Sequence, residues 1–169
     1  IMDNRTVEEA DARKTAAEVG LAAIKYGDLS NQASKDYIFD VDRFTSFEGN
    51  TGPYILYTIV RIKSILKKYA ENGGNAEGAK ILAAEKALML QVLKFNEVID
   101  TVYAETAPHK LCAYIYDLAN EFNKFYHETK ILSEEDEAKK SGYIALLNLA
   151  KKVLETCIDL LGFTAPERM

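Results

Sequence analysis

The sequence predicts an all-α protein: an antiparallel bundle of about five to six helices, with one short extended segment near residues 36–42. Apolar residues recur at helical spacing in several long stretches, and capping residues, glycine or proline bound these stretches. Strands and helices do not alternate in the way that builds a parallel sheet. The composition, 48% apolar and 28% charged, is that of an ordinary globular protein of 169 residues.

The first predicted helix spans residues 7 to about 26. Thr6 and Glu9 form a capping-box pattern at its start. The residues expected to face inward are mostly small: Ala12, Ala16, Val19, Ala23 and then Tyr26. An alanine stripe buries little apolar area but allows a close approach, so we expect this helix to need a close helical partner.

Residues 31–46 combine aromatic and acidic side chains. The alternating positions that predict the extended segment are Tyr37, Phe39 and Val41 against Ile38, Asp40 and Asp42. The two aspartates could belong to a carboxylate or metal site, but no His, Cys or further acidic cluster lies nearby in the sequence. We therefore expect them to cap the next turn or to pair with Arg43.

Residues 47–68 read FEGNTGPYILYTIVRIKSILKK and predict a central helix that begins at Pro53, with Thr51 or Gly52 as its N-cap. One face carries the core residues Ile55, Ile59, Ile62 and Leu66. Nearly opposite lie Tyr54, Tyr57 and Arg61. Either the tyrosines pack against a second neighbour with Arg61 on the surface, or this face is a platform for nucleotide bases, which stack on aromatic rings.

Three more helices are predicted, at residues 81–102, at residues 109–130, and from a capping pattern at Ser133 to about residue 161. Their expected core residues are Leu88, Val92, Phe95, Ile99 and Val102 in the first, Leu111, Ile115, Leu118, Phe122 and Phe125 in the second, and Leu147, Ala150, Leu154, Cys157 and Leu161 in the third. His109 and His127 have no carboxylate or cysteine partner at metal spacing, so we expect both on the surface.

The net charge of −5 argues mildly against a nucleic-acid partner, although Lys63, Lys67 and Lys68 could form a basic face at the end of the central helix. No apolar run approaches the length of a membrane span and no signal-peptide pattern opens the chain, so we expect no membrane partner and a cytoplasmic location. The two isolated cysteines fit a reducing compartment.

The run FEGNTGPY followed by Tyr57 and Arg61, and preceded by YIFDVDRFTS, resembles the arginyl-tRNA synthetase family. The resemblance extends from VGL at residue 19 to the terminal PERM. It implies a C-terminal fragment: residues 1–46 as the tail of the class I catalytic domain, and residues 47–169 as the all-helical anticodon-binding domain of the DALR type. The implied partners are the anticodon stem-loop of tRNA(Arg) and the rest of the synthetase chain, with no DNA and no membrane.

The resemblance also implies the residues that contact the anticodon loop. In this family the two tyrosines and the arginine of the GPYxxYxxxR helix lie beside that loop; here they are Tyr54, Tyr57 and Arg61. The tyrosine late in the following DALR helix matches Tyr126. One turn on, Lys130 stands where some members have an aromatic residue, which implies a phosphate contact. The terminal Met169 would close the anticodon pocket through its side chain or carboxylate.

No catalytic constellation can be assembled from the sequence. Neither histidine begins an HIGH-type motif, and no KMSKS-type lysine loop occurs. We therefore expect the fragment to be inactive alone and to need no cofactor, whereas the parent enzyme would use ATP with Mg. The alternative function is an α-helical protein-interaction module with no RNA role.

Overall fold

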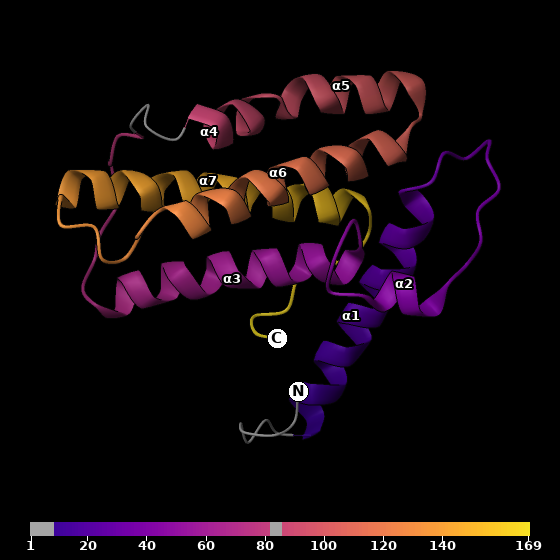
Figure 1. Cartoon of the computed structure of the whole chain (residues 1–169), viewed down its shortest axis with the longest axis horizontal. Helices are drawn as coiled ribbons and strands as arrows, with labels where there is room; N and C mark the ends of the chain where they lie inside the picture. The colour runs from indigo at the N-terminus through magenta and orange to yellow at the C-terminus, as the bar shows by residue number, and fades with distance from the viewer. Residues whose placement is uncertain (1–8, 82–85) are drawn as a thin grey trace.

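The computed structural model describes residues 9–81 and 86–169, and it confirms the all-α fold class (Figure 1). The helices within these ranges are α1 (Glu9–Leu29), α2 (Val41–Thr45), α3 (Gly52–Glu71), α4 (Lys86–Leu93), α5 (Phe95–Glu105), α6 (Pro108–Glu128) and α7 (Glu137–Leu160). No strand occurs in the described ranges. The segment at residues 36–40 has no regular structure, and Val41 begins α2 instead of continuing an extended run.

Local capping explains where α2 and α3 begin. The Asp40 side chain accepts a hydrogen bond from the backbone N–H of Arg43 at 3.1 Å, so Asp40 has the capping role expected for it. Thr51 is the N-cap of α3, and its Oγ1 accepts from the N–H of Tyr54 at 3.2 Å. Pro53 follows in the first turn, where its missing N–H has no consequence.

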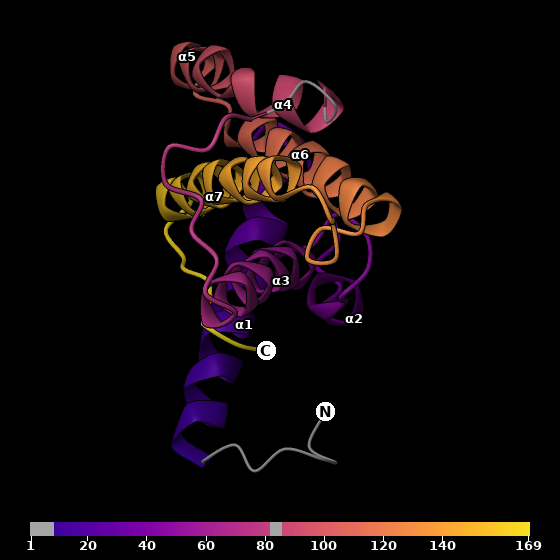
Figure 2. The ribbon, with the colours of Figure 1, turned by 90° about the vertical axis from the view of Figure 1, so that its left-hand side faces the viewer.

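The core lies between α3, α6 and α7. Helices α3 and α6 run in the same direction and α7 runs antiparallel to both, while α4 and α5 cover the far side of α6 (Figures 1 and 2). The predicted core residues of α3, α6 and α7 are buried, except Leu66, which is half-buried. Burial of these apolar faces is the main driving force for packing the helices.

Helix α1 makes the close contact that its alanines predict, but only with its C-terminal half. Ala22, Ala23 and Tyr26 are buried, and Ala22 lies against the N-terminus of α3. The N-terminal half projects away from the bundle (Figures 1 and 2). The expectation that Ala12 and Ala16 face inward is therefore wrong, because Ala12 is half-exposed and Ala16 is exposed. The predicted capping box begins at Thr6, outside the described residues.

Two other helix predictions need correction. The helix expected at residues 81–102 is divided at Lys94, whose N–H bonds to the carbonyl of Gln91, three residues back, at 3.3 Å. This tight turn interrupts the α-helical ladder, and α5 has no fully buried residue. The N-cap of α7 is Asp136 and not Ser133, because the Asp136 carboxylate accepts from the N–H groups of Ala138 and Lys139.

Candidate nucleic-acid interface

Helices α3 and α6 lie side by side and bring four of the six predicted site residues together. The guanidinium carbon of Arg61 lies 4.7 Å from the ring centroid of Tyr57 and 5.0 Å from that of Tyr126. These distances are those of cation–π interactions. Tyr54 occupies the preceding turn of α3 on the same side. Tyr57 is 42% exposed, so part of this aromatic surface faces solvent.

Tyr54 differs from Tyr57 in its surroundings. Its side chain is half-buried, its hydroxyl donates to Asn120 Oδ1 at 2.7 Å, and its ring contacts Tyr116. Burial raises the pKa of the Tyr54 phenol above its ordinary value, which favours the neutral hydroxyl further. Tyr54 therefore joins the interface to α6, whereas Tyr57 is the more accessible ring.

Three neighbours of this site were not predicted from the sequence. Asn120 and Asn123 face α3 from α6, and the ring of Phe47 meets that of Tyr57 edge-on at 6.5 Å. Asn123 precedes Tyr126 by three residues and Asn120 precedes Asn123 by three, so each pair occupies neighbouring positions on the surface of α6. This spacing was the only sequence feature that could have indicated the asparagines as site residues. It could not do so without knowledge of which helix packs against α6.

The other two predicted residues lie outside α3 and α6. Lys130 follows the end of α6 and is exposed. Met169 is half-buried and packs against the core at the end of the C-terminal tail. The ammonium group of Lys63 fixes this tail by donating to the carbonyls of Ala165 and Pro166 and to Glu167 Oε1, the last at 2.6 Å.

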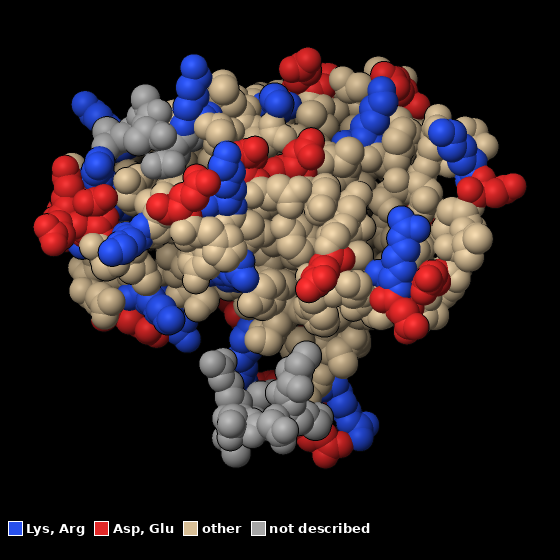
Figure 3. All heavy atoms as spheres, in the orientation of Figure 1, with Lys and Arg blue, Asp and Glu red and all other residues tan. Residues whose placement is uncertain are grey.

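The basic face proposed for the end of α3 is reduced by the same contacts. Lys63 is paired with Glu155 at 3.4 Å and with Glu167, and its side chain is only 13% exposed. Lys67 pairs with Glu71 at 3.8 Å, whereas Lys68 is exposed. Positive and negative side chains are interspersed on the face shown in Figure 3. The end of α3 is therefore not a continuous basic face.

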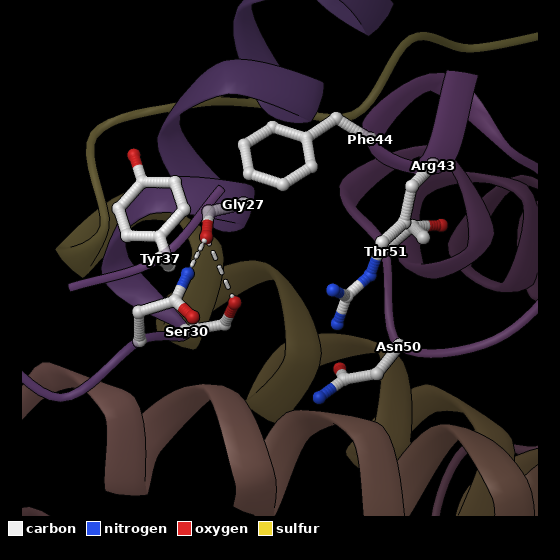
Figure 4. Close-up of a pocket in the computed structure, with 8 residues that line it drawn as sticks. Gly27, Ser30, Tyr37, Arg43, Phe44, Asn50 and Thr51 are labelled. Atoms are coloured by element: carbon white, nitrogen blue, oxygen red, sulfur yellow. Dashed lines mark hydrogen bonds between the residues drawn. The ribbon is translucent and has the colours of Figure 1, made fainter. Parts of the chain in front are cut away.

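A small pocket lies where the C-terminal end of α1 meets α2 and the turn before α3 (Figure 4). Gly27, Tyr37, Arg43, Phe44 and Asn50 are among its lining residues. Its volume is about 20 Å³, enough for about one water molecule. It is too small for a nucleotide base.

The remaining chemically reactive side chains do not form a site within the described ranges. Cys112 and Cys157 are both buried free thiols, and burial raises the pKa of each to about 12. No group of three His, Cys, Asp or Glu side chains in those ranges could hold a metal ion. Nor does any described helix combine the length and apolarity needed to span a membrane.

Comparison with known proteins identifies the family to which this chain belongs. The family model described as "DALR anticodon binding domain" matches residues 55–169, which is most of the chain. The chain belongs to the DALR anticodon binding domain family. The match includes Tyr57, Arg61 and Tyr126, and it extends to the terminal Met169.

Proteins similar to this DALR chain are arginyl-tRNA synthetases. The chain is 64% identical to the arginine–tRNA ligase of Agathobacter rectalis and 53% identical to that of Alkaliphilus oremlandii, over 99% and 100% of its own length. It spans 29% of the length of each of these curated relatives. The resemblance found in the sequence is thereby confirmed.

Solved structures agree with the sequence relatives. The arginyl-tRNA synthetase of Plasmodium falciparum matches 96% of the chain with a TM-score of 0.83 and 30% identity, and 29% of that protein is covered. The Thermus thermophilus enzyme matches 96% with a TM-score of 0.81 and 31% identity, and 31% of it is covered.

Proposed function

We propose that this chain binds the anticodon stem-loop of tRNA(Arg) as part of an arginyl-tRNA synthetase. The observation that carries the proposal is the guanidinium of Arg61 over the rings of Tyr57 and Tyr126, in a chain of the DALR anticodon binding family. Single-stranded loops are bound by stacking of bases on aromatic rings together with contacts from cations. An exposed tyrosine beside an arginine supplies both.

The chemistry of the ligand fits this arrangement. Every arginine codon has G in its middle position, so every arginine anticodon has a central C. Reading that base requires that it leave the loop stack, lie on an aromatic ring and form hydrogen bonds along its Watson–Crick edge. In this proposal Tyr57 and Tyr126 supply the stacking surface, Arg61 contacts an RNA oxygen, Lys130 contacts a phosphate and Met169 closes the pocket.

The proposed division of labour leaves the chemical step to the rest of the synthetase. ATP with Mg and the arginine substrate would bind there, and residues 1–46 would connect that part to the anticodon-binding residues 47–169. We propose a cytoplasmic location for the assembled enzyme, with neither DNA nor a membrane as a partner. The chain alone would then bind tRNA without aminoacylating it.

Replacement of Tyr57 tests the proposal. Tyr57→Ala is expected to weaken binding of a tRNA(Arg) anticodon stem-loop by about 1–3 kcal/mol, the range for a lost base stack. Tyr103→Ala is the matched control, because Tyr103 lies on α5 with 88% of its side chain exposed. Equal affinity of Tyr57→Ala and the parent in a fluorescence titration would remove Tyr57 from the site.

A salt series separates RNA binding from the alternative of a protein-interaction module. Phosphate contacts release counterions, so affinity for the stem-loop should fall steeply as salt rises. Binding to a partner protein through an apolar interface should instead change little with salt.

A further inference from the structure

Asn123 is hydrogen-bonded to three side chains of α3. Its Oδ1 accepts from Arg61 Nη1 at 2.6 Å, while its Nδ2 donates to Tyr54 Oη at 2.9 Å and to Thr58 Oγ1 at 3.2 Å. A guanidinium can only donate, so the amide oxygen must face Arg61. Both amide hydrogens then point to the two hydroxyls, and the orientation of this amide is fixed by its partners.

The contact with Asn123 holds Arg61 without neutralising it. In the described part of the chain no carboxylate pairs with Arg61: its recorded partners are the neutral amide and the rings of Tyr57 and Tyr126. A guanidinium has five N–H donors, and the amide accepts from one nitrogen. The half-buried cation therefore keeps its full charge and further donors for an external acceptor. An aspartate at position 123 would keep an acceptor for Arg61 but cancel that charge, and it would lose the donors to Tyr54 and Thr58.

We propose that Asn123 is the positioning residue of the RNA site, because it fixes the Arg61 guanidinium over the two tyrosine rings with its charge available to an oxygen of the bound RNA. This inference rests on the proposed function. Arg61 makes the RNA contact, and Asn123 acts through Arg61. A preformed arginine loses less conformational entropy on binding than one that is free to rotate.

A double-mutant cycle measures whether Asn123 acts through Arg61. Affinities for the tRNA(Arg) anticodon stem-loop are compared for the parent, Asn123→Ala, Arg61→Ala and the double variant. Asn123→Ala is expected to bind about 10-fold more weakly, the lower range for losing a hydrogen bond to a charged group. The double variant should bind within about 2-fold of Arg61→Ala, since residues that act as one unit are not additive. If the fold-losses in affinity of Asn123→Ala and Arg61→Ala multiply in the double variant, the two residues act independently and the proposal is overturned.

Two further variants exclude a purely structural effect. Asn123→Asp is almost the same size and retains an acceptor for Arg61, but it loses the donors to Tyr54 and Thr58. The loss of those two hydrogen bonds changes no charge, so the salt slope reports the compensated charge of Arg61. Weaker binding with a smaller salt slope than the parent is expected, and parent-like affinity and slope would overturn the proposal even if Asn123→Ala fails to fold. Asn148→Ala, at an exposed position of α7, is the matched control and should bind like the parent.

The same measurements separate failure of this inference from failure of the proposed function. If Arg61→Ala binds as tightly as the parent while Tyr57→Ala is weakened, the inference is overturned and RNA binding stands. If Arg61→Ala does weaken binding, stem-loops with C or A at the central anticodon position locate the RNA oxygen that Arg61 contacts. An equal loss of affinity for both stem-loops indicates a phosphate oxygen, and a loss for the stem-loop with C alone indicates a base edge. Either result is compatible with the positioning role of Asn123.

Discussion

Gly52→Ala tests the close contact that joins α1 to α3. A Cβ atom built on Gly52 would lie 2.3 Å from the carbonyl oxygen and 2.5 Å from the carbonyl carbon of Ala22. Both are backbone atoms, so the two helices must move apart to accommodate a methyl group. Overpacking of this kind costs about 1–3 kcal/mol. The reduced entropy of the unfolded chain offsets about 0.4–1 kcal/mol of it.

Taken at the middle of these two ranges, the net result is a loss of about 1–2 kcal/mol in the free energy of unfolding. For a chain of this size that loss lowers Tm by about 2–8 °C. Circular dichroism during thermal and urea unfolding measures it. Gly20→Ala is the matched control, because Gly20 lies within α1 with nothing within 4 Å of its Cβ position. That substitution should stabilise the chain, and a Gly52→Ala variant as stable as Gly20→Ala would refute the close packing of α1 on α3.

Two further predictions concern the tail and the thiols. Lys63 lowers the pKa of Glu167 below its ordinary value of 4.5, so the stabilisation is present above that value and is lost as the pH falls through the lowered pKa. Glu167→Gln should therefore reduce the free energy of unfolding at pH 7 by at most about 1 kcal/mol, as expected for an exposed ion pair, and a gap that persists at pH values well below 4.5 would contradict this cause. Because burial raises the pKa of Cys112 and Cys157 to about 12, neither should react with a thiol reagent at pH 8 until urea unfolds the chain. Reaction of the native chain at the rate of the unfolded chain would show that the thiols are accessible.

Much of the fold could be predicted from helical periodicity and capping residues. Ile55, Ile59 and Ile62 are fully buried, and α6 begins at Pro108, one residue before its predicted start. Periodicity succeeds here because each of these helices has one continuous face against the core. It failed for residues 81–102, where one apolar stripe continues across two helices and the tight turn at Lys94 leaves no mark in the pattern.

The candidate site was predicted only in part, for a physical reason. Helical phase placed Tyr54, Tyr57 and Arg61 on one face of α3, but it could not show what lies opposite. The packing of α6 adds Tyr126 to the Arg61 side chain and introduces Asn123, whose role depends on three contacts with another helix. Likewise, Lys63 reads as a surface cation in the sequence, and only the path of the tail shows its pairing with Glu155 and Glu167.

The proposed function is binding of the anticodon loop of tRNA(Arg) with recognition of its middle base. The most direct measurement is a titration of the 169-residue chain against two anticodon stem-loops that differ only in C or A at the central position. We predict tighter binding of the stem-loop with C, by about 1–3 kcal/mol for the base-specific contact that is lost with A. Absence of binding to either stem-loop at low salt would contradict it.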